Sequence, residues 1–294
     1  MGFDGNGLLF LQRTYKQQGA FGSTATIGRQ GIHLPGAVLH RFIKSQYEIE
    51  QGDFADDLLV RAFGSSEVTS IDNSAYEGAS TVLDLNLEMN SELEEKFDTV
   101  IDGGSIEHIF DSKTAINNIS RLVKPGGQIL HMTPSNNWCG HGFYQFSPEF
   151  FFAVYSEQRG FSDVEVLLAR EGNYKTWYRV EKPRNGQRAE IHTGLPVTCL
   201  VRAKKYASNP LSTAVQQSDY ITLWHENGPG PSGVLRDNLL PLKRLVKRVP
   251  WLAKIATNAL FSAQQTSLGQ VIHYWFTKGL NRRNKWLTKV STRV

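Results

Sequence analysis

The chain has 294 residues, of which 40% are hydrophobic and 20% are charged, and its net charge is +4 at pH 7. This composition is typical of a folded globular protein and excludes a disordered chain. The two cysteines, Cys139 and Cys199, are too few for a disulfide framework, which favours a reducing compartment and a cytoplasmic protein. The sequence predicts neither a signal peptide nor a membrane-spanning segment, which would need about 18 uninterrupted apolar residues.

The first apolar run, residues 25–27, stops at Gly28, and two more glycines follow at Gly31 and Gly36. Glycine after a strand lets the backbone approach a nucleotide, but this spacing, G-x-x-G-x-x-x-x-G, matches neither common phosphate-binding pattern. Taken alone, the segment is compatible with a nucleotide-binding turn or with an ordinary turn.

The rest of the first 205 residues alternates short apolar runs with segments that suit helices. This alternation is typical of βαβ units and predicts a doubly wound, mostly parallel α/β sheet of the Rossmann-like kind. Residues 170–196 are polar and rich in turns, so we expect an insertion or a long hairpin there. The predicted strands after the first are 68–72, 81–85, 97–102, 127–133, 164–169 and 197–203, and the predicted helices are 53–63, 113–123 and 147–158.

Acidic residues stand at the ends of three predicted strands, where ligands bind in a doubly wound sheet. Asp72, followed by Asn73, could accept hydrogen bonds from both ribose hydroxyls of an adenosine cofactor, and Asp84 could recognise the adenine edge. Asp102 is followed by Gly103-Gly104, which leave room for a ligand. For the acids at 72 and 84, the alternative is a turn or capping residue.

Two segments in this order resemble the class I S-adenosylmethionine-dependent methyltransferases: FDTVIDGGSIEH at 97–108 and RLVKPGGQILHMTP at 121–134. The resemblance implies a seven-stranded, mostly parallel sheet whose final, antiparallel strand is 197–203. It also implies S-adenosyl-L-methionine as the cofactor, with Glu107 supporting the pocket or the fold and His108 as a structural residue. The implied cofactor contacts are Asp72 and Asn73 at the ribose, Asp84 and Leu85 at the adenine, and Gly28, Asp102, Gly103 and Gly104 at the methionine end.

The first glycine loop departs from the family's pattern, because its usual acid and G-x-G turn are absent. Arg29 and Gln30 occupy the turn instead. A guanidinium there could pair with the methionine carboxylate, or it could exclude the cofactor. We predict replacement of the usual contacts and therefore count Arg29 and Gln30 among the cofactor-binding residues.

In this fold the loop at residues 133–151 lies over the reactive methyl group, where the acceptor is selected. Its amides and aromatic rings suit a hydroxylated, sugar-like acceptor, and we predict substrate contacts from Asn136, Asn137 and Tyr144. His141 stands between two glycines and could take a proton from the attacking hydroxyl. The alternative is that this loop packs against the edge of the sheet. No metal site is predicted.

We therefore expect an S-adenosylmethionine-dependent methyltransferase that acts on an oxygen or nitrogen nucleophile of a small-molecule or glycan-like acceptor. The alternative function is a non-catalytic binding or scaffold protein that has kept the methyltransferase fold and lost cofactor binding.

The charge divides the chain into parts of opposite sign. Residues 1–205 carry 20 Lys and Arg against 25 Asp and Glu, whereas residues 206–294 carry 12 against three. We predict a methyltransferase-like domain over 1–205, a linker-like segment over 206–235 and a basic helical extension over 236–294. The basic extension has three interpretations: helices packed on the domain or on a second subunit, peripheral contact with an anionic membrane, or, least favoured, nucleic-acid binding.

Overall fold

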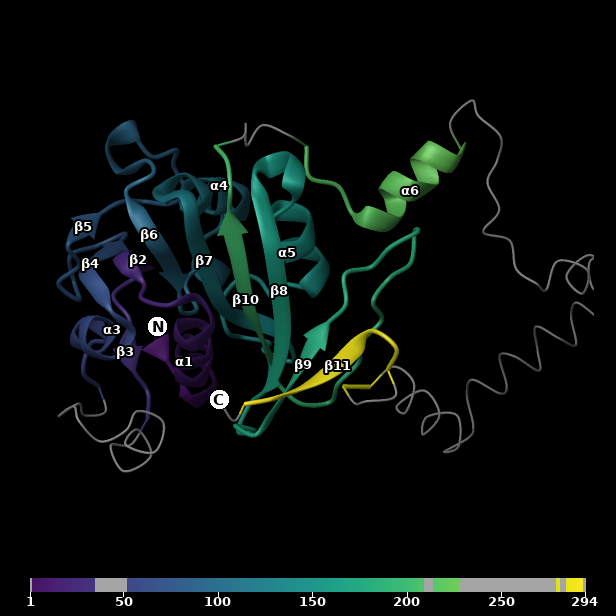
Figure 1. The fold of residues 1–294 in the computed structure, drawn as a ribbon, viewed down its shortest axis with the longest axis horizontal. Coiled ribbons are helices and arrows are strands. Elements are labelled where there is room, and N and C mark those ends of the chain that lie inside the picture. Colours follow the sequence, from purple (N-terminus) through teal and green to yellow (C-terminus); the bar gives the residue numbers. More distant parts are fainter. Residues whose placement is uncertain (1, 35–51, 209–213, 228–278, 281–283, 293–294) are drawn as a thin grey trace, which may run out of the picture.

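A mixed sheet of nine strands forms the centre of the structure, with helices on both of its faces (Figure 1). The computed structural model describes residues 2–34, 52–208, 214–227, 279–280 and 284–292. The strands of the sheet are β2 (Gly22–Ile27), β4 (Ser65–Asp72), β5 (Thr81–Val82), β6 (Phe97–Asp102), β7 (Val123–Asn136), β8 (Phe161–Arg170), β9 (Thr176–Val180), β10 (Val197–Lys205) and β11 (Leu287–Ser291). The helices are α1 (Gly5–Gln18), α3 (Asp56–Phe63), α4 (Ser112–Leu122), α5 (Pro148–Val154) and α6 (Ser218–Asn227).

The strand order is β11-β9-β8-β10-β7-β6-β2-β4-β5. The five strands from β7 to β5 pair in parallel, while β10 runs antiparallel to both of its neighbours, β7 and β8. The Rossmann-like α/β fold is therefore confirmed, and residues 197–203 do form the antiparallel strand. A separate two-stranded pair joins β1 (Gly2–Phe3) to β3 (Gly31–Ile32), which directly follows the first glycine turn.

The sheet has nine strands because β9 and β11 extend it beyond the seven that were predicted. β9 lies in the 170–196 insertion, where Trp177 and Val180 are buried. It covers the edge of β8, which would otherwise expose unpaired backbone groups. β11, in yellow in Figure 1, in turn pairs antiparallel with β9.

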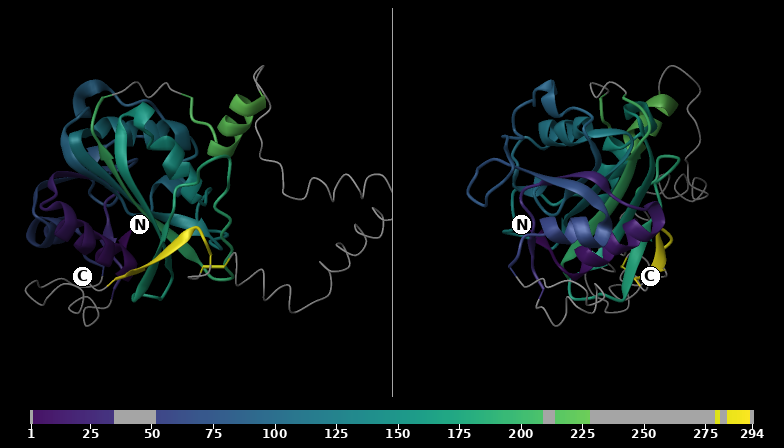
Figure 2. Two further views of the ribbon diagram at one scale, coloured as in Figure 1. Left: turned by 45° about the vertical axis from the view of Figure 1, so that its right-hand side comes forward. Right: turned by 60° about the vertical axis from the view of Figure 1, so that its left-hand side comes forward.

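Apolar side chains form two cores, one on each face of the sheet. α4 and α5 pack on one face, and α1 and α3 pack on the other (Figure 2). α4 shows how the sequence sets these contacts: Asp111 caps its N-terminus by accepting from the Thr114 N–H at 3.0 Å, and Ile116 and Ile119 face the sheet. Because helices cover both faces of the sheet, the ends of its strands are what remains open to solvent. In such sheets, ligands bind beyond the carboxyl ends of the parallel strands.

The part of the chain beyond residue 205 differs from the prediction wherever it is described. α6 lies inside the predicted linker-like segment, and its Asp219 is buried against the Arg188 guanidinium, with Nε 2.5 Å from Oδ2. The end of the predicted helical extension is the strand β11, because Leu287 is buried against the sheet. The other expectations for 236–278 fall outside the described residues. Within the described part of the chain, no helix has the length and apolarity that a membrane span requires.

Candidate active site

The carboxyl ends of β2, β4, β5 and β6 border a cavity of about 210 Å³. Five of the predicted cofactor-binding residues line it: Gly28, Asp72, Asn73, Asp84 and Leu85. Apolar side chains from β2 and β4, from the residues after β5 and from the turn after β6 supply its other walls. The remaining lining residues are Ile27, Ile71, Leu83, Asn86, Ser105, His108 and Ile109. The structure thus brings together, at the carboxyl ends of the parallel strands, side chains up to 82 positions apart in the chain, from Ile27 to Ile109.

The two carboxylates of this cavity also shape the turns that follow their strands. Asp72 Oδ1 accepts from the Ser74 N–H at 3.3 Å, and Asp84 Oδ1 accepts from the backbone and side-chain amides of Asn86 at 2.9 and 2.8 Å. The hydrogen bonds from Asn86 lower the pKa of Asp84 below its ordinary value. The turn interpretation is therefore met by both residues, and the ligand interpretation stays a prediction, which the second oxygen of each carboxylate leaves open.

Arg29 does not lie where a cofactor carboxylate was expected. Its Nε contacts Asp56 Oδ2 at 3.2 Å, its Nη1 donates to the Glu77 carbonyl at 2.9 Å, and its guanidinium lies 4.0 Å from the centre of the Phe54 ring. An acid, a carbonyl and an aromatic face satisfy the charge outside the cavities. The predicted role of Arg29 in holding the methionine carboxylate is therefore not supported by its position.

Gln30 is buried and joins the first glycine turn to the turn after β6. Its Nε2 donates to the Ile27 carbonyl at 2.5 Å and lies 3.4 Å from Ser105 Oγ, which itself donates to the Ile27 carbonyl. Gly103 leaves the space that the Gln30 side chain fills: a Cβ at position 103 would collide with Gln30 Oε1 and lie 2.8 Å from the Phe3 ring. Gln30 lines neither cavity of the site, so the structure gives it a bridging role.

Gly103→Ala is expected to destabilise the protein by about 1–3 kcal/mol, because the added methyl group overpacks two buried side chains. The matched control is Gly194→Ala, where a Cβ would meet nothing within 4 Å, and its effect is expected to stay within about 0.5 kcal/mol. Urea denaturation of both variants measures the difference. Equal midpoints for the two variants would show that the turn is loosely packed.

Asp102 is buried in a polar chain beneath the site and lines neither cavity. Its Oδ2 lies 2.7 Å from His131 Nδ1, its Oδ1 accepts from the Ser105 N–H at 2.7 Å, and His131 Nε2 lies 2.6 Å from the Tyr155 hydroxyl. The predicted contact of Asp102 with the cofactor is corrected accordingly: this carboxylate holds the turn after β6 and the buried histidine.

A second cavity, of about 310 Å³, adjoins the first, because His108 lines both. Of the predicted residues, Gly103, Gly104 and His141 line it. Sequence reasoning did not single out Met132, Thr198 or the side chains near the chain's start. The full lining is Gly2, Asp4, His33, Gly103, Gly104, Glu107, His108, Met132, Pro134, Trp138, His141, Glu171 and Thr198.

The three predicted acceptor contacts, Asn136, Asn137 and Tyr144, do not line this second cavity. Asn137 has a positive φ of 59° and its Nδ2 donates to the carbonyls of Thr193 and Leu195, at 2.7 and 3.0 Å. Asn136 Oδ1 accepts from the Asn137 N–H at 3.0 Å. The Tyr144 hydroxyl donates to a backbone carbonyl at 2.7 Å. These hydrogen bonds hold the loop after β7 in place, and the acceptor contacts of the three side chains stay a prediction.

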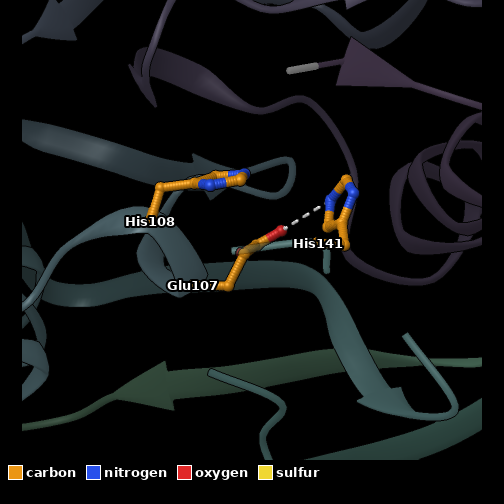
Figure 3. A group of neighbouring side chains, drawn as sticks. All are labelled: Glu107, His108 and His141. Carbon is orange, nitrogen blue, oxygen red and sulfur yellow. Dashed lines mark ion pairs between the residues drawn. The ribbon is translucent and has the colours of Figure 1, made fainter. Parts of the chain in front are cut away.

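Glu107, His108 and His141 meet at the wall of the second cavity (Figure 3). His141 Nε2 lies 3.5 Å from Glu107 Oε1, and the rings of His108 and His141 are 5.3 Å apart. Burial, together with the charge of Asp102, raises the pKa of Glu107 to about 8. Burial and the neighbouring His141 lower the pKa of His108. The Glu-His pair, two residues beyond the double glycine, is the sequence signal for this cluster, although the resemblance assigned Glu107 to support of the pocket or the fold and His108 to a structural role.

A larger cavity, of about 930 Å³, lies at the other end of the parallel strands, near the start of β8 and the end of the antiparallel β10. Five of its charged side chains are paired with one another: Glu165 contacts both Arg13 and Arg179, and Arg202 contacts Asp163. None of the predicted site residues lines it. We therefore place the functional site at the carboxyl ends of the parallel strands.

The mostly parallel sheet with helices on both faces is the Rossmann-like α/β fold that the sequence predicts, and two adjoining cavities lie beyond the carboxyl ends of its parallel strands. Residues 52–131 match a family model described as a methyltransferase domain. This part of the chain is therefore similar to a methyltransferase domain. The match covers β4, β5 and β6 and includes Asp72, Asp84, Glu107 and His108.

Solved structures with a similar chain trace include two methyltransferases. One is an S-adenosylmethionine-dependent methyltransferase from Thermotoga maritima, with 16% identity over 69% of this chain and 90% of that chain and a TM-score of 0.37. Another is the N-methyltransferase NodS from Bradyrhizobium japonicum, with 15% identity over 68% of this chain and 94% of that chain and a TM-score of 0.39. No protein of curated function matches the sequence.

Proposed function

We propose that this protein transfers a methyl group from S-adenosylmethionine to an oxygen or nitrogen atom of a small, hydroxylated acceptor. The observation that carries the proposal is the pair of adjoining cavities that share His108. One is bordered by carboxylates and apolar walls, and the other holds imidazole rings and a buried carboxylate. Methyl transfer needs two such neighbouring sites, because the methyl donor and the acceptor must be held in line.

The first cavity has hydrogen-bond acceptors and apolar walls that suit an adenosine group. Asp72 would accept hydrogen bonds from the ribose hydroxyls, and Asp84 would meet the adenine edge, while Leu83, Leu85 and Ile109 supply apolar walls for the base. When bound, S-adenosylmethionine supplies a methyl group on a positively charged sulfur atom. Gly28, with φ of 74°, keeps the end of β2 free of a side chain at the mouth of this cavity.

The second cavity is where we place the acceptor. His141 is half exposed there, so its imidazole can meet a ligand hydroxyl, and its Nε2 already faces Glu107. Trp138 lines the same wall, and its Nε1–H donates to the Val197 carbonyl at 3.0 Å, which fixes the ring on β10. A hydroxyl acceptor has to lose its proton, and His141 is the side chain that we assign to receive it.

The bridging position of Gln30 favours a second candidate function, that of a binding protein without methyl transfer. Gln30 fills the space at Gly103, beside the place where the methionine end of the cofactor is expected. Calorimetric titration of the full chain with S-adenosylhomocysteine separates the two functions. Saturable binding, followed by transfer of labelled methyl from S-adenosylmethionine to a panel of sugars, phenols and amines, supports the enzyme. No heat at about millimolar ligand would leave the binding protein as the function.

His141→Asn is expected to lower kcat by about 10²–10⁴-fold, because the variant removes the assigned proton acceptor from the second cavity. The affinity for S-adenosylhomocysteine should change by no more than about twofold, since His141 does not line the first cavity. His192→Asn, an exposed histidine outside both cavities, is the matched control. Unchanged turnover in His141→Asn would contradict the assignment.

A further inference from the structure

We infer that Glu107, His108 and His141 bind a divalent transition-metal cation at the wall between the two cavities. One donor atom from each side chain takes part, and the three atoms lie within 4.8 Å of one another. Figure 3 shows the Glu107 carboxylate pointing toward the His141 ring, with the His108 ring beside it. Among the residues that the structure describes, this is the group of three potential metal ligands whose donor atoms lie this close to one another.

Backbone hydrogen bonds bring the three ligands together from two separate segments. Glu107 and His108 belong to the 3-10 turn Ile106–His108 that follows β6, and His141 belongs to the loop after β7. The Glu107 carbonyl accepts from the Phe143 N–H at 2.7 Å and from the Tyr144 N–H at 3.2 Å, which ties the loop to the turn. The approach is close: a Cβ on Gly142, whose φ is 81°, would lie 2.8 Å from the Glu107 carbonyl oxygen.

The state of the Glu107 side chain is the second, independent observation. Glu107 is 0% exposed, and neither of its carboxylate oxygens has a hydrogen-bond partner among the described residues. A buried carboxylate without hydrogen bonds costs free energy, and burial is otherwise accompanied by pairing or by metal coordination. His141 Nε2, at 3.5 Å, is too distant for a hydrogen bond. A cation between the two groups would satisfy the carboxylate.

The donor set favours a transition metal over calcium or magnesium. Imidazole nitrogens bind Zn²⁺, Fe²⁺, Co²⁺ and Ni²⁺, whereas Ca²⁺ and Mg²⁺ prefer oxygen ligands. Bonds of about 2.0–2.2 Å place neighbouring donors about 3 Å apart, so the present atoms must approach by about 1–2 Å. Both histidines are exposed to solvent in part, which leaves their rings room to turn, while Glu107 stays fixed by burial. Three protein ligands leave open positions for an acceptor in the second cavity.

In a methyltransferase this cation would change the role of His141, and that part of the inference rests on the proposed function. A hydroxyl coordinated to a divalent cation loses its proton to solvent more readily, because the cation stabilises the oxyanion that remains. His141 would then act as a ligand and not as the proton acceptor. The two roles differ in one respect: turnover by a free histidine base survives removal of metal, whereas turnover that depends on the cation is lost and returns with Co²⁺ or Zn²⁺.

The test uses the full chain, freed of metal with a chelator, desalted and titrated with CoCl₂ while the visible absorption of Co²⁺ is recorded. We expect saturable binding of about one Co²⁺ per chain, weakened at least tenfold in Glu107→Gln and in His141→Asn. His192→Asn is the matched control and should bind within about twofold of the unchanged protein. Absence of saturable binding, or equal affinity in all variants, would overturn the inference.

Two further measurements distinguish loss of the metal site from unfolding and separate the two proposals. Thermal unfolding of each variant shows whether it is folded, and if Glu107→Gln is not, His108→Asn and His141→Asn carry the test, since their side chains lie at the surface. Titration with S-adenosylhomocysteine separates the two proposals. Cobalt binding without nucleoside binding would retain the metal site and reject the methyltransferase, and the reverse result would reject the metal site alone.

Discussion

Asp72→Ala is expected to weaken binding of S-adenosylhomocysteine by about 10–100-fold, as measured by calorimetric titration. Asp72 ends β4 and lines the first cavity, where its carboxylate would accept hydrogen bonds from two ribose hydroxyls. Hydrogen bonds to a charged group contribute about 1.5–3 kcal/mol, and about 1.4 kcal/mol corresponds to a tenfold change in affinity. The size of the effect follows from the loss of the whole carboxylate from the cavity.

The control for Asp72 is Asp57→Ala. Asp57 is an exposed acid on α3 that pairs with Arg61 at 3.0 Å and lies outside the cavity, so its removal should leave the affinity within about twofold. Each variant removes one negative charge from the protein. A difference between them therefore reports a contact with the ligand and not a change in the protein's net charge. An affinity for S-adenosylhomocysteine that is the same in both variants would show that the ribose does not bind at Asp72.

Asp102→Ala is expected to lower the free energy of unfolding by about 3–5 kcal/mol, which is a large part of the stability of a typical domain. The change leaves His131 Nδ1 and the Ser105 N–H without their acceptor in a region that water does not reach. Such unsatisfied buried groups cost far more than the hydrogen bond itself contributes. Urea denaturation measures the loss.

Tyr155→Phe examines the same polar chain without the risk that the protein fails to fold. It removes only the hydroxyl next to His131 Nε2, and we expect a cost of about 1–3 kcal/mol. The matched control is Tyr206→Phe: Tyr206 is exposed and donates to the Glu157 carbonyl at 2.8 Å, so the cost should be at most about 0.5 kcal/mol. If both tyrosines cost the same, the buried chain does not stabilise the turn after β6.

The positions of Asp72, Asp84 and Gly28 could be predicted from sequence because they depend on local order along the chain. Each residue ends a strand or follows one within two positions, and parallel strands have their carboxyl ends on the same side of the sheet, so strand order alone brings the three together. The direction of 197–203 followed from the family resemblance and agrees with β10. The partners of Arg29 and Asp102 could not be predicted, because nothing in the chain order shows that Asp56 and His131 lie beside them.

The amino-acid sequence by itself determined the alternation of strands and helices, the buried faces of both, and the cofactor edge of the sheet, since hydrophobic period and turn residues act over a few positions. Tertiary structure alone decided which polar side chains line the two cavities and which are paired elsewhere. Arg29 is satisfied by Asp56, Gln30 fills the space above Gly103, and the loop after β7 brings His141 to Glu107 from 34 positions away. Partners for charged and polar groups come from whichever segments pack nearby, and that packing depends on the whole fold.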